Sequence, residues 1–228
     1  MYLLSSIVPI GILDMWNQAD LFTALIVVIL MGMSLLCWTV FIAKLMTIYV
    51  KVYQLRVFLL RIKSQDEFKH FLSVAERYAT TLPGRYVSEN LHYIKQLTRI
   101  DKDTWEPITA EQWSFIREHM GYLVEVFIDH EDSYTVILSL SGTTAPLLGL
   151  LGTVWGLIQT FIAFQGVSHQ GFHLLIPGVM AALGTTLVGL IVALPAVMMY
   201  VVLQRKLLIL ERLLWALYDL ILARLYNV

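Results

Sequence analysis

The fold is decided by residues 132–205, whose sequence is DSYTVILSLSGTTAPLLGLLGTVWGLIQTFIAFQGVSHQGFHLLIPGVMAALGTTLVGLIVALPAVMMYVVLQR. Its first and last residues are charged, and no Asp, Glu, Lys or Arg lies between them. A transmembrane helix needs about 20 mostly apolar residues, so this stretch has room for two spans and a turn. Residues that favour a break stand at 165–171 and at Pro177-Gly178. We therefore predict a second span at 139–164, a turn at 165–178 and a third span at 179–203.

An earlier apolar run, residues 21–43, carries no charge and ends at Lys44, which predicts a first span. Charged residues make up 14% of the chain, against about 25% in soluble domains, and the mean hydropathy is +0.70. We expect an all-α membrane protein with three transmembrane helices. Residues 1–20 are expected outside the membrane, as an interfacial segment or an apolar tail.

Basic residues indicate the orientation, because they are enriched in the cytoplasmic parts of membrane proteins. Of the 16 Lys and Arg residues, twelve lie between Lys44 and Arg117 and four lie from Arg205 onward. The predicted turn has none. We therefore expect residues 44–138 and the tail 204–228 in the cytoplasm, and the N-terminal segment and the turn on the periplasmic side.

The long region between the first two spans is predicted to be helical. Ser64-Gln-Asp-Glu67 and Thr109-Ala-Glu-Gln112 both have the spacing of a capping box. Apolar residues then recur at helical spacing, as in Phe115, Tyr122 and Val126. Residues 112–140 contain no proline, so one helix is expected to run through them into the second span. The tail is expected to be helical as well.

An acidic cluster, Asp129-His-Glu-Asp132, stands near the predicted cytoplasmic face of the membrane. Such a cluster is usually a solvated surface, and a proton exit is the alternative interpretation. The net charge of −1 indicates no nucleic-acid partner. No nucleophile–base pair, phosphate loop or metal-ligand cluster stands out, so we predict no enzyme, no cofactor and no metal.

Small residues form a stripe along each of the last two predicted spans. Because lipid supplies no hydrophobic force between helices, small residues that let backbones approach favour their association. The intervals in the second span are three and four residues, which places the stripe on one helix face. This predicts tight helix packing, within one chain or between chains. The stripes consist of Gly142, Ala145, Gly149, Gly152 and Gly156 in the second span, and of Gly178, Ala182, Thr185, Gly189 and Ala196 in the third.

Threonines and prolines mark the same two spans. Thr153 and Thr160 stand seven residues apart, and Thr185-Thr186 lies within the third span. Each hydroxyl can bond a carbonyl one turn back, or the threonines can form a weakly polar ring that holds water or another chain's carboxylate. Pro146 and Pro195 each remove a helix hydrogen bond and can kink the helix.

The segment Ala145-Pro-Leu-Leu-Gly-Leu-Leu-Gly-Thr-Val-Trp-Gly-Leu-Ile158 resembles the TolQ/ExbB/MotA proton-channel family, in particular its TolQ/ExbB branch. A second match follows in the third span, with Pro177-Gly178, Ala182-Leu183, Thr186, Gly189-Leu190 and Ala193-Leu-Pro-Ala-Val197 in the order and spacing of that family. The resemblance covers about 60 residues well. The region before the second span matches in length and helical character only.

The resemblance implies a function and a set of partners. Five copies form a ring, and a dimer of a TolR/ExbD-like single-span protein passes helices through it, each with a membrane Asp that takes up protons. Proton flow then drives an envelope or outer-membrane process, through a TonB/TolA-like protein as a further partner. The resemblance implies that Thr153 and Thr186 face the proton-carrying Asp and that Gly149, Gly152 and Gly156 pack the helices. From their place in the spans we expect Thr160, Thr185 and Ala181 to line the same path.

One residue departs from the family pattern. The family usually has a Glu shortly before the third-span threonine, and here Ala181 occupies that position. A buried carboxylate in a membrane is costly and usually functional, so its absence removes one polar group from the proton path. Two hypotheses remain: a motor subunit whose pore carries no carboxylate, or an oligomeric scaffold that conducts nothing. A solute transporter is a weaker third, because the spans offer no charged midplane site.

Overall fold

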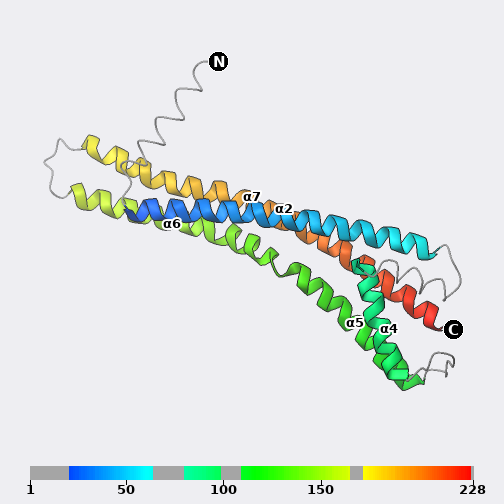
Figure 1. Cartoon of the computed structure of the whole chain (residues 1–228). Coiled ribbons are helices and arrows are strands. Elements are labelled where there is room, and N and C mark those ends of the chain that lie inside the picture. The colour runs from blue at the N-terminus through cyan, green and yellow to red at the C-terminus, as the bar shows by residue number, and fades with distance from the viewer. Residues whose placement is uncertain (1–20, 64–79, 99–108, 165–171, 227–228) are drawn as a thin grey trace, which may run out of the picture. The chain divides into compact units, whose positions relative to one another are not determined.

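The computed structural model describes residues 21–63, 80–98, 109–164 and 172–226 (Figure 1). Every regular element within these ranges is a helix, which confirms the predicted all-α class. The predictions for residues 1–20 and for the Ser64 capping box lie outside the described residues. The helices are α2 (Leu21–Lys63), α4 (Leu82–Thr98), α5 (Ala110–Asp132), α6 (Thr135–Phe164) and α7 (Phe172–Tyr226).

Three of these helices, α2, α6 and α7, are long and apolar enough to cross a membrane. Their most apolar windows have mean hydropathies of 2.6, 1.6 and 2.5, which confirms the predicted number of spans. Both α2 and α7 continue well beyond the predicted span ends at residues 43 and 203. The helical pattern does not stop where the charges begin, since no Gly or Pro follows either span end before the helix ends.

Two predicted boundaries differ from the structure. Residues 172–178, which we expected in the turn, belong to α7, so the Pro177-Gly178 pair lies inside a helix. Residues 112–140 do not form one helix, because α5 ends at Asp132 and α6 begins at Thr135. The N–H of Ser133 still donates to the Asp129 carbonyl at 3.0 Å, and its hydroxyl donates to the His130 carbonyl at 3.0 Å. These bonds satisfy carbonyls that a helix end leaves open.

The chain divides into two compact units. Unit 1 comprises Met1–Ile42 and Thr135–Val202, and unit 2 comprises Ala43–Tyr134 and Leu203–Val228. In unit 1 the buried core is small, and many large apolar side chains on its helices are exposed in the single chain. Such a surface suits contact with lipid or with other membrane helices. The core consists of Ile26, Leu30, Ala145, Val192 and Ala193.

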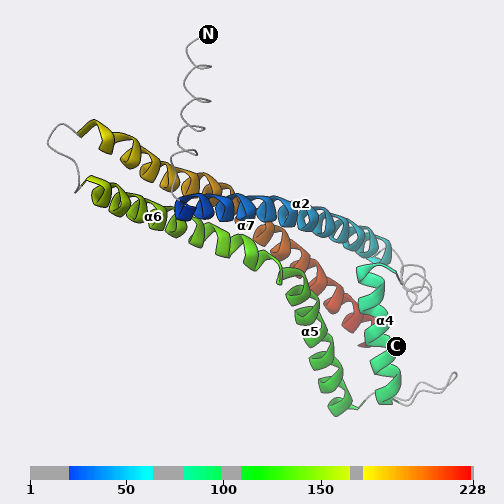
Figure 2. The same cartoon turned by 60° about the vertical axis from the view of Figure 1, so that its left-hand side comes forward.

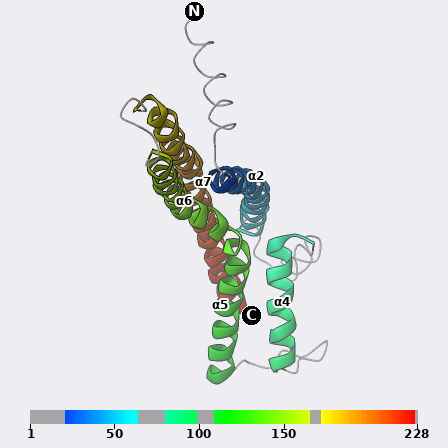
Figure 3. The same cartoon turned by 90° about the vertical axis from the view of Figure 1, so that its left-hand side faces the viewer.

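Unit 2 has a larger core of aliphatic and aromatic side chains from α2, α4, α5 and α7, including Phe58, Tyr86 and Leu214. Helix α4 runs beside α5 (Figure 2, Figure 3). The predicted capping box at Thr109 is confirmed at the start of α5. The buried stripe of α5 is Ile116, Met120 and Val124, whereas the stripe singled out from the sequence, Phe115, Tyr122 and Val126, is exposed by 45%, 61% and 41%.

Candidate functional site

The small residues of α6 lie directly against α7 within the same chain. A Cβ built on Gly152 would lie 2.7 Å from Thr185 Oγ1, and one on Gly156 would lie 2.8 Å from the Cβ of Ala182. A Cβ on Gly149 would meet backbone atoms, at 3.0 Å from the Thr185 carbonyl oxygen. The two antiparallel helices are therefore in backbone contact, as glycine in membrane helices allows.

The same contact continues toward both ends of the helices. A Cβ on Gly142 would lie 2.6 Å from Cγ2 of Val197, and one on Gly178 would overlap Thr160 Oγ1. On α7, a Cβ on Gly189 would lie 2.6 Å from the Ala145 carbonyl oxygen. Glycines of both helices thus make room for the partner helix. The two prolines, Pro146 and Pro195, are half-buried within helices that run through them.

Two threonines of α7 bond across to α6 at one point. The hydroxyls of Thr185 and Thr186 lie 3.1 Å and 3.2 Å from the carbonyl oxygen of Gly149. Because Gly149 has no side chain, both hydroxyls reach its carbonyl. Thr185 Oγ1 also lies 2.7 Å from the Ala182 carbonyl in its own helix. The structure therefore places the hydroxyls of Thr185 and Thr186 at one carbonyl of α6, where the two helices are in backbone contact.

The threonines of α6 bond within their own helix. The hydroxyl of Thr153 donates to the Leu150 carbonyl at 2.7 Å, and that of Thr160 donates to the Gly156 carbonyl at 2.7 Å. Each hydroxyl has one proton and two acceptor lone pairs, so its oxygen can still accept a bond from water or from a protonated carboxyl. Thr153 is 7% exposed in the single chain, one turn from Gly149.

Ala181 lies on a different side of α7 from Thr186. At 3.6 residues per turn, the two positions are about 140° apart around the helix. Ala181 is half-buried. It lies on the same face of α7 as Val188 and Val192, and these two valines pack in the core of unit 1 together with Ile26 of α2. The structure thus does not bring Ala181 and Thr186 to one face.

Helix α2 adds an aromatic contact that the sequence reasoning missed. The rings of Phe22 and Trp155 lie 4.7 Å apart between centroids, at an interplanar angle of 47°. Trp155 stands inside the glycine-rich segment of α6, but nothing in its spacing identifies Phe22 as its neighbour. This contact joins α2 to α6.

The fold and the site define a class of protein. It is an all-helical membrane protein in which two apolar helices meet along glycines, and the polar groups at their contact are threonine hydroxyls, not charged side chains. The family model described as "MotA/TolQ/ExbB proton channel family" matches residues 92–214, more than half of the chain. The chain belongs to this family.

Individual members of the family share about a quarter of their residues with this chain. The biopolymer transport protein ExbB of Pseudomonas putida is 27% identical over 196 residues, which cover 84% of this chain and 56% of that protein. The Tol-Pal system protein TolQ of Haemophilus influenzae is 26% identical over 196 residues, or 84% of this chain and 83% of its own. ExbB of Salmonella typhimurium is 24% identical over 198 residues, or 86% and 79%. The match thus spans little more than half of the Pseudomonas putida protein and most of the other two.

Proposed function

We propose that this chain is the ring-forming subunit of a motor in the bacterial inner membrane, driven by the proton-motive force. Five copies surround a dimer of a TolR/ExbD-like single-span protein whose membrane Asp carries the protons. The assembly delivers energy to an envelope or outer-membrane process, through a TonB/TolA-like protein. The N-terminus is periplasmic and the C-terminus cytoplasmic. Membership of the family and the relatives named ExbB and TolQ support this proposal.

The observation that carries the proposal is the uncharged, hydroxyl-bearing contact between α6 and α7. Thr153 stands one turn after Gly149 on α6, and the hydroxyl of Thr186 on α7 bonds to the Gly149 carbonyl. No Asp, Glu, Lys or Arg lies in α6 or in residues 172–204 of α7. In the proposed motor the titrating group therefore belongs to the partner, and the threonine oxygens accept a bond from its protonated form. One charge that crosses 100 mV releases about 2.3 kcal/mol, so a few protons supply the energy of a conformational step.

The exposed apolar surface of unit 1 supports assembly into a ring. Along α7 the side chains of Leu183, Leu187, Leu190 and Leu194 are exposed by 59%, 60%, 51% and 69% in the single chain. Because these residues repeat every three or four positions, they form one stripe on the helix. The stripe suits a lipid or a neighbouring helix in the proposed pentamer.

The experiment replaces hydroxyls by methyl groups of similar size. Thr153→Val and Thr186→Val should each abolish energy-dependent function while the inserted amount stays unchanged. Thr39→Val is the matched control, because Thr39 of α2 is exposed and donates to the Leu35 carbonyl at 2.8 Å; it should retain function. Full function in both test variants would contradict the polar path.

A non-conducting scaffold for the same partner is the second candidate function, and Ala181 in place of the usual carboxylate favours it. Proton flux into proteoliposomes that contain this chain and its partner separates the two. Flux that depends on the partner's Asp supports the motor. An intact complex without flux supports the scaffold.

A further inference from the structure

Glu131, near the end of α5, is buried between two lysines of α2. Its side chain is 3% exposed. Oε1 forms an ion pair with Lys51 Nζ, and Oε2 lies 3.6 Å from Lys44 Nζ. The sequence suggested a solvated acidic cluster at this place, and that interpretation is wrong for Glu131, because its carboxylate is turned into the protein.

Lys44 also caps the C-terminal end of α5. Its Nζ donates to the backbone carbonyl of Glu131 at 2.9 Å and lies 4.9 Å from the centre of the Tyr134 ring. The last carbonyls of a helix have no partner within it and carry the negative end of its dipole, so a lysine ammonium stabilises the helix end. A third helix joins here, because Gln204 of α7 donates to Asp132 Oδ1 at 2.9 Å.

We name this group the clasp: Lys44, Lys51, Glu131, Asp132 and Gln204. All five residues belong to unit 2. The chain leaves unit 2 at three places, next to Ala43, Tyr134 and Leu203, and a clasp residue stands close in sequence to each. The clasp therefore links α2, α5 and α7 within unit 2, close in sequence to the residues where the chain passes into unit 1.

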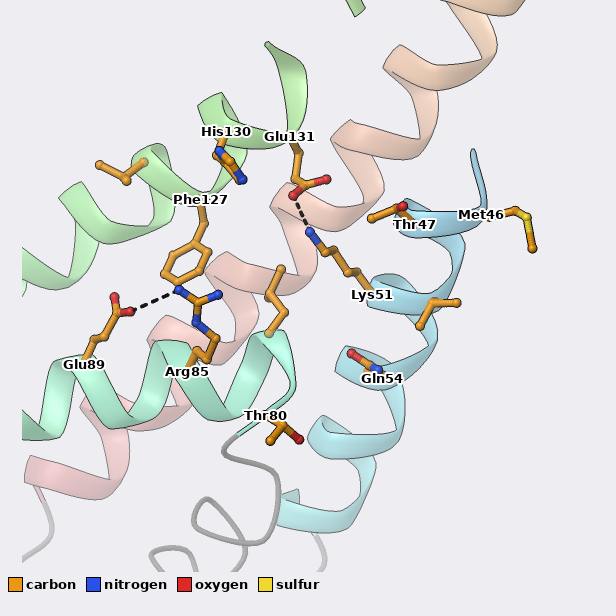
Figure 4. A pocket seen from close by; sticks show the side chains of 13 residues that line it. Met46, Thr47, Lys51, Gln54, Thr80, Arg85, Glu89, Phe127, His130 and Glu131 are labelled. Carbon is orange, nitrogen blue, oxygen red and sulfur yellow. Dashed lines mark hydrogen bonds and ion pairs between the residues drawn. The ribbon is translucent and has the colours of Figure 1, made fainter. Parts of the chain in front are cut away.

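A cavity of about 710 Å³ lies beside the clasp, within unit 2 (Figure 4). Lys51 and Glu131 line it from α2 and α5, together with Thr47 and His130. Glu131 Oε2 makes no hydrogen bond. The ion pair thus stands at the edge of the cavity, with one carboxylate oxygen that accepts no hydrogen bond.

A buried ion pair is weak support for stability, because removing two charges from water costs about as much as their attraction returns. Its best-attested benefit is specificity, since a buried charge tolerates only one alignment of its partner. The clasp has the features that this role requires: one buried carboxylate, two lysines about two turns apart on one face of α2, and a capped helix end.

We propose that Lys44, Lys51 and Glu131 are positioning residues that fix the axial register of α2 against the end of α5. In the proposed motor this register sets how the spans are held while the partner's Asp loads and releases protons. That functional consequence rests on the proposed function. The register itself does not.

The test compares charge with packing. The triple variant Lys44→Met, Lys51→Met and Glu131→Met keeps the volume and removes the charges. Its thermal midpoint should stay close to that of the unmodified chain, because the relieved desolvation of the charges offsets the lost bond from Lys44 to the Glu131 carbonyl. Glu131→Gln leaves two ammonium groups without their carboxylate and should lower the midpoint. Lys51→Arg keeps the charge and should behave like the unmodified chain. Glu89→Gln is the matched control, since its ion pair with Arg85 is 3.9 Å long and exposed.

Thiol cross-linking in the full-length complex measures the register. The single cysteine is removed by Cys37→Ala, and cysteine pairs are placed at Thr47 with His130 and at Thr47 with Val126, all of which line the cavity. In the triple variant the ratio of the two cross-linking yields should change, and energy-dependent function should fall to the level of cells without the gene. An unchanged ratio in a folded triple variant would overturn the proposal. Full function with a changed ratio would overturn its functional consequence and leave the register assignment in place.

The two proposals fail separately. If the unmodified complex carries no proton flux, the motor proposal fails, and the cross-linking ratio still decides the role of the clasp. If flux is present and the triple variant keeps the original ratio, the clasp is a packing element and the motor proposal stands.

Discussion

Gly189→Ala tests the helix contact with the smallest possible change. The added Cβ would lie 2.6 Å from the Ala145 carbonyl oxygen and 3.1 Å from the Cα of Gly149. Both neighbours are backbone atoms of α6, so no side chain can rotate out of the way. Relief requires the two helices to separate by up to about 1 Å, the shortfall from an ordinary contact of about 3.5 Å.

The expected cost follows from what this separation disturbs. Overpacking a tight contact costs about 1–3 kcal/mol. The bonds from Thr185 and Thr186 to the Gly149 carbonyl, already 3.1 Å and 3.2 Å long, would stretch, at about 0.6 kcal/mol each for bonds between membrane helices. The better helix propensity of alanine returns up to about 1 kcal/mol. We expect a net destabilisation of about 2 kcal/mol.

Thermal unfolding in detergent, followed by helical circular dichroism, measures this cost once membrane insertion is confirmed. Gly32→Ala in α2 is the control, because a Cβ there has no neighbour within 4 Å; it should leave the midpoint unchanged or raise it. If Gly189→Ala and Gly32→Ala have the same midpoint, α6 and α7 do not approach as closely as the structure has them.

Three further predictions concern unit 2 and use the same unfolding assay. Burial raises the pKa of Tyr86, and its hydroxyl donates to the Met120 carbonyl at 2.8 Å, so Tyr86→Phe should cost about 1 kcal/mol at every pH between 6 and 9; a neutral result would refute the bond. Burial lowers the pKa of His119 below its ordinary 6.5, so the unfolded chain binds the proton more tightly and stability should fall as the pH drops through 6.5 toward the folded pKa. His119→Phe should flatten this dependence, and an unchanged slope would assign it to another group. Thr109→Ala removes the side-chain acceptor of the Gln112 N–H and should cost about 1 kcal/mol, measurable as a lower midpoint than that of the neighbouring Ser114→Ala.

The sequence determines the spans because their signal is local. A continuous run of more than 70 residues without a charged side chain crosses lipid most simply as helices, whose backbone bonds are satisfied within each segment. Its length and the break at 165–171 then give two spans. The helix ends do not follow, because α2 and α7 continue with residues that are equally good helix formers. The break after Asp132 is formed by Ser133 and Tyr134, neither of which is a strong breaker.

The contact between α6 and α7 was partly predictable for a similar reason. The three- and four-residue spacing of glycines places them on one face of α6, and only one other apolar helix follows within reach. The spacing does not say which carbonyl each threonine bonds. The sequence therefore does not distinguish Thr153 from Thr186 by bonding partner. In the structure Thr153 bonds within α6, whereas Thr186 bonds from α7 to α6.

The clasp was not predictable, because its partners are far apart in the chain. Lys44 and Glu131 are separated by 87 residues, and no local pattern connects them. Glu131 stands among three other polar residues at 129–132, so the sequence does not show that it differs from them in burial. Only the direction of its side chain, which depends on where α5 ends, distinguishes it from Asp129 and His130.

The position of Ala181 bears on the choice between motor and scaffold. A carboxylate at 181 would continue the stripe of Val188 and Val192, whose neighbours include residues of α2, whereas Thr186 bonds to α6 about 140° away around the helix. Replacing that carboxylate by a methyl group therefore leaves the face that carries Thr186 as it was. A scaffold that owes its lack of conduction to Ala181 requires a proton path along both faces of α7. A motor requires only the face that carries Thr186, so the absent carboxylate weighs less against conduction than the sequence alone suggests.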